Sequence, residues 1–168
     1  MSTSHLPEVI VINYIFDTNS LSSIIKHYFP SGFPSFWDKF RSSVEISQII
    51  SVREVKRELG DRFSDDQISH LITGNKDFFE SPTNGELAFI TEIYRVPHFK
   101  QNMESKKILS GGPFADPFVI AKGKIALRTV VTEEVIKPNG AKIPNICDHF
   151  SIPCINFEGF LTQESWRF

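Results

Sequence analysis

The fold of this chain is decided by the stretch VIVINYIF, residues 9–16, a nearly continuous run of β-branched and aromatic side chains. A run without polar alternation is typical of a strand buried on both faces, as in a parallel sheet. The next four residues, DTNS at 17–20, are rich in helix-capping side chains, and apolar residues at helical spacing follow from Leu21 to Tyr28. The sequence therefore predicts that the chain opens with a strand, a turn and a helix.

Strand and helix signals alternate along the rest of the chain, except in the middle third, where helix signals dominate. We expect strands at 45–50, 129–132 and 153–156, and helices near 35–40, at 52–59, 65–72, 84–94, 99–109 and 116–126, and at the C-terminus. The turn GGP at 111–113 is expected to be a hinge. Helices between strands imply right-handed crossovers and a parallel sheet. We therefore predict one domain, residues 1–168, that is a three-layer α/β/α sandwich with a mainly parallel sheet, a helical insert at 65–109 and a loosely ordered or disordered segment at about 1–8.

Composition limits the classes of protein to consider. The 168 residues are 40% hydrophobic and carry a formal net charge of −2, so no global positive field draws the chain onto nucleic acid. No apolar run reaches the roughly 18 residues of a membrane span, and the first residues lack the pattern of a secretory signal. With only two cysteines, we expect a reduced, cytoplasmic protein without membrane contact.

Acidic side chains follow the predicted strands at the edge where ligands bind in open α/β sheets. Asp17 ends the first strand, Glu133 and Glu134 end the strand at 129–132, and Asp116 and Glu58 lie on helices near the same edge. Each has a simpler interpretation, as a helix cap or a solvated surface charge. Carboxylates gathered at one edge repel each other, so such a site usually also gathers cations, and Mg²⁺ is a suitable hard ion. The pattern favours metal-assisted attack of water on a phosphodiester, with one or two ions.

The helix predicted at 52–59 carries two candidate acids. An apolar stripe formed by Val52, Val55 and Leu59 places Glu58 at its border and Glu54 farther toward water. We therefore expect Glu58 to be the functional carboxylate.

Four spaced motifs resemble, in order, the four acidic motifs of PIN domains. They are YIFDTN at 14–19, VREVKREL at 52–59, ADPFVIA at 115–121 and VVTEE at 130–134. YFP at 28–30, FW at 36–37 and KIP at 142–144 are closer to a PIN-like family long described as of unknown function, distantly similar to VapC-type toxin ribonucleases. The resemblance covers the chain from about Val9 to the terminal helix.

The resemblance implies an endoribonuclease that depends on Mg²⁺ or Mn²⁺, with RNA as substrate, as the toxin of a toxin–antitoxin pair. An antitoxin protein and a homodimer are the partners it suggests. Motif matching implies catalytic Asp17, Glu58, Asp116 and Glu134, metal ligands Asp17, Asp116 and Glu134, and supporting Asn19, Thr132 and Glu133. The family generally has Asp at the fourth acidic position, and here either Glu133 or Glu134 can take it. The helical insert of this chain is also longer than that of small toxins of this type.

Several other interpretations stay open. Because the fourth acid is unusual, a second class of protein stays possible, namely a catalytically weak PIN-like module that binds a protein or RNA partner. A phosphoacceptor receiver domain is a third and weaker alternative. Basic residues beside the acidic edge either hold backbone phosphates or are solvated: Arg53, Lys56, Arg57, Lys122, Lys124 and Arg128. The aromatic residues at 29–40 are expected to be core rather than a surface on which bases stack.

Overall fold

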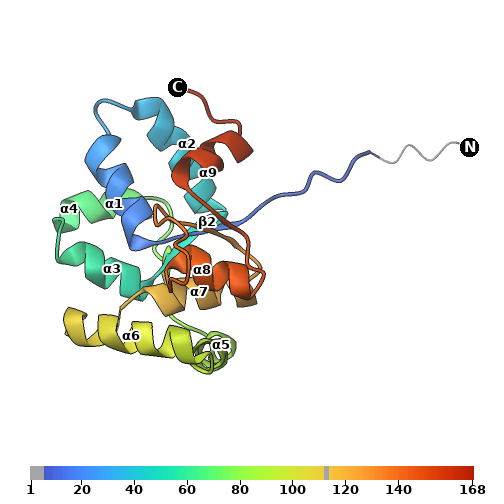
Figure 1. Cartoon of the computed structure of the whole chain (residues 1–168). Helices are drawn as coiled ribbons and strands as arrows, with labels where there is room; N and C mark the ends of the chain where they lie inside the picture. The colour runs from blue at the N-terminus through green and yellow to red at the C-terminus, as the bar shows by residue number, and fades with distance from the viewer. Residues whose placement is uncertain (1–5, 112–113) are drawn as a thin grey trace, which may run out of the picture.

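A parallel sheet forms the centre of the computed structural model, which describes residues 6–111 and 114–168 (Figure 1). Within the described residues the sheet has five strands in the order β3-β2-β1-β4-β5, and every neighbouring pair is parallel. Their bounds are β1 Tyr14–Phe16, β2 Ile49–Val52, β3 Phe79–Glu80, β4 Thr129–Val131 and β5 Cys154–Ile155. The predicted α/β sandwich with a parallel sheet is confirmed.

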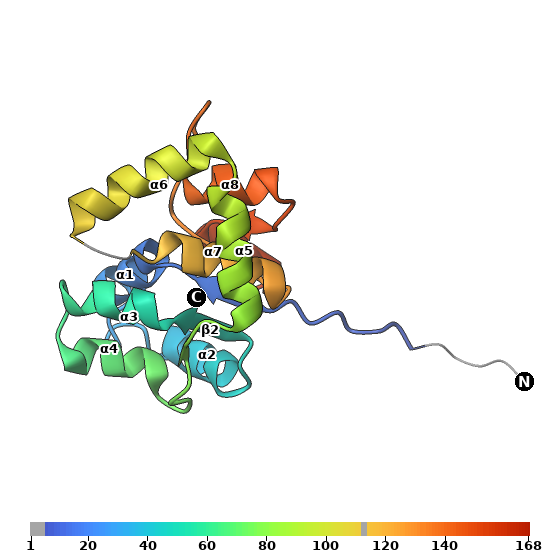
Figure 2. The same ribbon diagram turned by 90° about the horizontal axis from the view of Figure 1, so that it is seen from below.

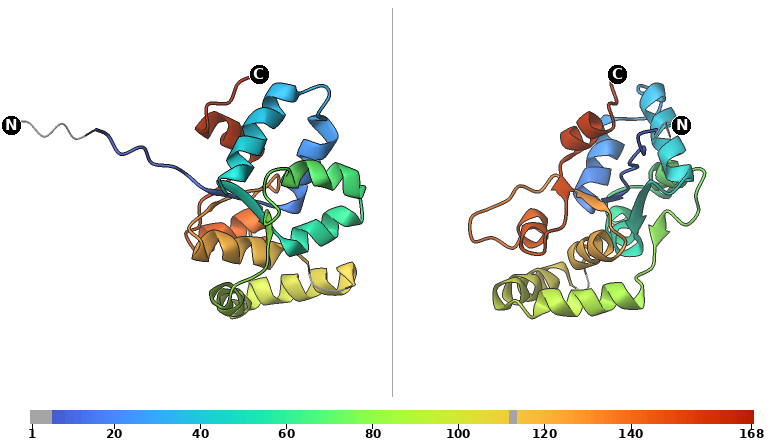
Figure 3. Two further views of the ribbon diagram at one scale, coloured as in Figure 1. Left: turned by 180° about the vertical axis from the view of Figure 1, so that it is seen from behind. Right: turned by 90° about the vertical axis from the view of Figure 1, so that its right-hand side faces the viewer.

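Helices cover both faces of this sheet. Their bounds are α1 Thr18–His27, α2 Pro34–Glu45, α3 Arg53–Gly60, α4 Asp65–Ile72, α5 Asn84–Tyr94, α6 Pro97–Ser110, α7 Asp116–Ile125, α8 Ile143–His149 and α9 Phe157–Gln163. Figures 1 and 3 show α1, α2 and α9 on one side of the sheet and α7 with α8 on the other. Only part of the helical insert predicted at 65–109 forms an outer layer: α5 packs against α7 and α6 against α5 (Figure 2). Helix α4 instead packs against α2 and α3, and β3 joins the central sheet.

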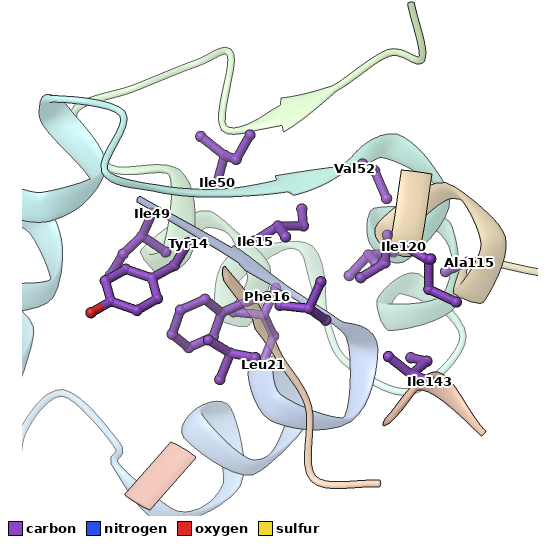
Figure 4. Close-up of a cluster of buried hydrophobic side chains, with 14 of the residues drawn as sticks. Tyr14, Ile15, Phe16, Leu21, Ile49, Ile50, Val52, Ala115, Ile120 and Ile143 are labelled. Atoms are coloured by element: carbon purple, nitrogen blue, oxygen red, sulfur yellow. The ribbon is translucent and has the colours of Figure 1, made fainter. Parts of the chain in front are cut away.

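The core lies on the two faces of β1. Tyr14 and Phe16 point to one face, where their rings lie 4.7 and 5.1 Å from the ring of Phe160 in α9. Ile15 points to the other face, toward Ile120 of α7 (Figure 4). All three residues of β1 are fully buried. This two-sided burial explains why the β1 sequence has no polar alternation.

The first half of the predicted opening strand is not a strand. Residues 6–13 have no regular secondary structure, and Val9 and Ile10 are exposed on a segment that runs away from the domain (Figure 1). Pairing of β1 begins only at Tyr14, opposite Ile49 of β2 and Thr129 of β4. Without a neighbouring strand, β-branched residues alone do not form a ladder. The other part of the N-terminal prediction, residues 1–5, lies outside the described residues.

The remaining elements match their predicted ranges with a few differences. The helices at 65–72 and 84–94 have the predicted bounds, and α4 and α5 both begin with a capping box. The strand expected at 45–50 begins later, at Ile49, because α2 continues to Glu45. Strand β3 and helix α8 were not predicted. Gly111 ends α6 in a left-handed conformation with φ 74°, and the rest of the expected hinge, 112–113, lies outside the described residues.

Candidate active site

An acidic cleft lies at the carboxyl edge of the sheet. Its volume is about 400 Å³, and it is bordered by the start of α1, by α3, by the last turns of α6, by the start of α7 and by the loop after β4. The residues that line it are Thr18, Asn19, Glu58, Arg62, Lys106, Leu109, Ser110, Phe114, Asp116, Glu134 and Lys142. Three of the four predicted catalytic acids, Glu58, Asp116 and Glu134, therefore share one cleft, together with Asn19.

Asp17, the fourth predicted acid, is almost completely buried behind this cleft. It is 2% exposed, and it also caps α1, because its Oδ1 accepts the N–H of Ser20 at 2.8 Å. Its Oδ2 accepts the hydroxyl of Thr132 at 2.5 Å. Burial raises the pKa of Asp17 to about 7, the hydrogen bonds from Thr132 and Ser20 oppose that rise, and the charge of Asp116 adds to it. Asp17 therefore both caps α1 and contributes a carboxylate to the candidate site.

Glu58 is held in the cleft by two hydrogen bonds. Its Oε2 accepts the hydroxyl of Thr18 at 2.5 Å, and its Oε1 accepts the backbone N–H of Ala115 at 2.9 Å. These bonds join α3 to the first turn of α1 and to the residue before Asp116. Glu58 is therefore positioned by the two segments that carry the neighbouring acids.

The orientation predicted for Glu54 is wrong. Glu54 is 3% exposed, its Oε1 accepts from the Nε of Arg53 at 2.8 Å, and its Oε2 is buried with no hydrogen-bond partner among the described residues. The apolar stripe included Val52, but Val52 ends β2 and α3 begins at Arg53. The stripe on α3 therefore consists of Val55 and Leu59 alone, and Glu54 is buried in the first turn although it lies well away from that stripe. Glu58 keeps its predicted place at the border of the buried face.

The structure separates the two adjacent glutamates after β4. The backbone N–H of Glu134 donates to the Thr132 hydroxyl at 3.1 Å, and its Oε2 accepts the N–H of Ile143 at the start of α8. Glu133 turns the other way, and its Oε1 accepts the N–H of Phe157 at the start of α9. Glu134 lines both the acidic cleft and a neighbouring hollow of about 590 Å³, whereas Glu133 lines that hollow and not the cleft. The geometry therefore favours Glu134 as the partner of Asp116 and Glu58.

Most of the six basic residues considered for phosphate binding have other contacts. Lys122 is buried between Glu80 and Glu86, and Arg128 donates to the backbone carbonyls of Tyr14, Ser47 and Gln48. Arg53 pairs with Glu54, and Lys124 donates to the carbonyl of Phe150. Lys56 and Arg57 are exposed on α3, with Lys56 over the ring of Phe79.

The cations that do line the cleft were missed by the sequence reasoning: Arg62, Lys106 and Lys142. The chain offers one indirect signal for Lys106. It lies ten residues before Asp116, and a glycine that ends a helix lies between them. A chain reversal at that glycine brings the last turns of α6 beside the start of α7.

The donor set of the cleft fits a hard divalent cation, although the carboxylates are not yet gathered around one point. Among residues 6–111 and 114–168, no group of three or more His, Cys, Asp or Glu side chains is already arranged to hold a metal ion. One of the acids nevertheless forms an ion pair, because the ammonium of Lys106 lies 3.0 Å from Asp116 Oδ2. The oxygens of Asp17, Asp116 and Glu134 are the ligands that Mg²⁺ and Mn²⁺ prefer.

Fold and site together define a parallel α/β sandwich with an acidic cleft at the carboxyl edge of its sheet. The chain belongs to the DUF4411 family, described as a domain of unknown function, whose model matches residues 14–168. No curated protein sequence matches the chain significantly.

A solved structure with a similar fold is that of PAE2754 from Pyrobaculum aerophilum. It aligns with a TM-score of 0.51 at 14% identity over 94% of this chain and 100% of that one. At this identity the likeness supports the fold alone. No helix in the described part of this chain has the length and apolar character needed to cross a membrane.

Proposed function

We propose that this chain is a PIN-like, metal-dependent endoribonuclease that hydrolyses RNA phosphodiester bonds, acting as the toxin of a toxin–antitoxin pair. One observation carries the nuclease assignment: Glu58, Asp116 and Glu134 come from three separate elements and line one cleft, with the buried carboxylate of Asp17 behind it. A fold stabilised by burial gains little from gathering acids, so a functional reason is needed for their arrangement.

The four acids have two tasks in this proposal. Asp17, Asp116 and Glu134 would hold the metal, and Mg²⁺ or Mn²⁺ bound there would supply a Lewis acid for the phosphodiester and its attacking water. Glu58, anchored by Thr18 and Ala115, faces the cleft and accepts the proton of that water. Thr132 fixes the rotamer of Asp17 and the backbone of Glu134 with one hydroxyl, so it couples two ligands.

The test of this function compares the wild type with Asp17→Asn. Asn caps a helix about as well as Asp, so the fold is expected to survive while the charge is lost. We expect the purified wild type to cleave total RNA with Mg²⁺ or Mn²⁺ and to stop in EDTA, and cleavage by Asp17→Asn to fall by orders of magnitude. Equal cleavage by both proteins contradicts the assignment. Absence of cleavage by the wild type in either metal favours the alternative, a catalytically weak module that binds RNA or a protein.

A further inference from the structure

Lys106 brings a positive charge directly onto an acid of the cleft. Its ammonium lies 3.0 Å from Asp116 Oδ2 and 5.8 Å from the centre of the Phe114 ring. Within the described part of the chain, Asp116 alone among the acids that line the cleft has an ion pair. The cation comes from α6, the outer helix of the insert, and not from any of the acidic motifs.

This ion pair differs in burial from the pair between Lys122 and Glu86. The side chains of Lys106 and Asp116 are 32% and 20% exposed, whereas those of Lys122 and Glu86 are 3% and 2% exposed. A buried pair cannot be opened without leaving a charge unpaired away from water. A pair in contact with water is weak, and its ammonium can leave and be hydrated. The Lys106 contact is therefore suited to exchange, and the Lys122 contact is not.

Once released from Asp116, the Lys106 ammonium can take part in binding an anion in the same cleft. Arg62 and Lys142 line the same walls, so a free Lys106 adds a third positive charge to a cleft whose acids are occupied by a cation. Three basic side chains around such a cation attract a polyanion, and the backbone phosphate of RNA is the anion that the proposed reaction supplies. Lysine suits this task because its flexible stem carries a compact charge.

We propose that Lys106 alternates between two anions: it neutralises Asp116 in the metal-free protein, and it binds an RNA phosphate once a divalent cation has taken its place. This inference rests on the proposed function and adds to it an order of events, in which metal loading creates the phosphate-binding cleft. The outer helix of the insert thereby takes part in substrate binding.

The experiment compares Lys106→Met with Lys107→Met. Lys107 is the next residue of α6, is exposed and borders a different hollow with Tyr94 and Phe118, so its substitution removes the same charge from the same helix. Mn²⁺ binding is measured by calorimetry. Binding of a fluorescent, hydrolysis-resistant phosphorothioate RNA is measured by anisotropy over a series of salt concentrations in saturating Mn²⁺.

We expect the two readouts to move in opposite directions. Lys106→Met removes the competitor of Mn²⁺, so the Kd for Mn²⁺ falls about two- to five-fold, the range of a part-exposed ion pair. The same variant binds the RNA more weakly, and the slope of log affinity against log salt becomes shallower by about 0.7, one phosphate contact on a single strand. Lys106→Gln gives the same directions, and Lys107→Met changes neither readout.

The outcomes separate this inference from the function beneath it. If the wild type and Lys106→Met bind Mn²⁺ equally, or if Lys107→Met has the same effect as Lys106→Met, the exchange is wrong and the nuclease assignment stands. Unchanged RNA binding by Lys106→Met also overturns the exchange. If none of the proteins binds Mn²⁺, the metal site and the exchange fall together.

Discussion

Replacing Asp17 by Asn removes a buried negative charge and changes the shape of the side chain very little. The carboxylate is 2% exposed, and its pKa is raised by burial from an ordinary 3.8 to about 7. The native state therefore holds a proton more tightly than the unfolded state does. Between about pH 4 and pH 7 the Asp17 carboxyl is protonated in the native state and ionised in the unfolded state.

The sign and size of the stability change follow from this difference. Because the folded pKa is the higher one, the contribution of Asp17 to stability is fully present below about pH 4 and is lost as the pH rises through about 7. A gap of about three pKa units corresponds to about 4 kcal/mol. Asn does not ionise, and it keeps the cap on the Ser20 N–H. We expect Asp17→Asn to be up to about 4 kcal/mol more stable than the wild type at pH 8 and equally stable near pH 4.

Urea denaturation in EDTA at pH 4, 5.5, 7 and 8 measures this difference. The free energy of unfolding of the wild type minus that of the variant should become more negative between pH 4 and 7 and then level off. Ser20→Ala is the control, because it leaves the carboxylate in place. Its stability should still fall as the pH rises from about 4, and the fall should extend to higher pH because the Ser20 side-chain hydrogen bond that lowers the pKa of Asp17 is lost. A variant that is no more stable than the wild type at pH 8 would refute the conclusion that burial raises the pKa of the Asp17 carboxylate.

Further substitutions test the other acids and the buried ion pair. Glu58→Gln should abolish RNA cleavage, whereas Glu54→Gln, which lies outside the cleft, should retain it in the same assay. Glu134→Gln should weaken Mn²⁺ binding measured by calorimetry about ten-fold or more, as loss of a charged ligand does, whereas Glu133→Gln should leave it unchanged. Lys122→Met should cost about 3–5 kcal/mol of stability in urea denaturation, because it leaves a carboxylate buried without its partner. A loss below about 1 kcal/mol would contradict that burial.

The main elements of the fold could be predicted because local pattern and tertiary environment agree there. The strand at Thr129–Val131 is an apolar run, and it is buried. The helix at Asn84–Tyr94 begins with a capping box, which marks its first turn. Strand β3 has only two residues, too few for a period to appear. The segment around Cys147 resembles a sheet edge by composition, yet it forms α8, with Pro144 in its first turn.

The candidate site was predictable in part for a related reason. A topological rule places the ends of β1 and β4 at one edge, and Asp17 and Glu134 follow those strands. The partners of basic side chains are set by contacts distant in sequence, so no local pattern distinguishes buried Lys122 from Lys106 in the cleft. The burial of Glu54 was missed because the apolar stripe of its helix does not predict it, and packing in the first turn of α3 depends on neighbours distant in sequence.

The ion pairs of Lys122 also bear on what the outer helices contribute to the domain. Lys122 lies on the helix that starts at Asp116, and the carboxylates that neutralise it, Glu80 and Glu86, come from β3 and α5. Without α5 and α6, Lys122 would lose Glu86 and keep Glu80, and the side of α7 that α5 covers would meet water. The outer layer therefore supplies part of the negative charge that allows a lysine to lie in the interior of the domain.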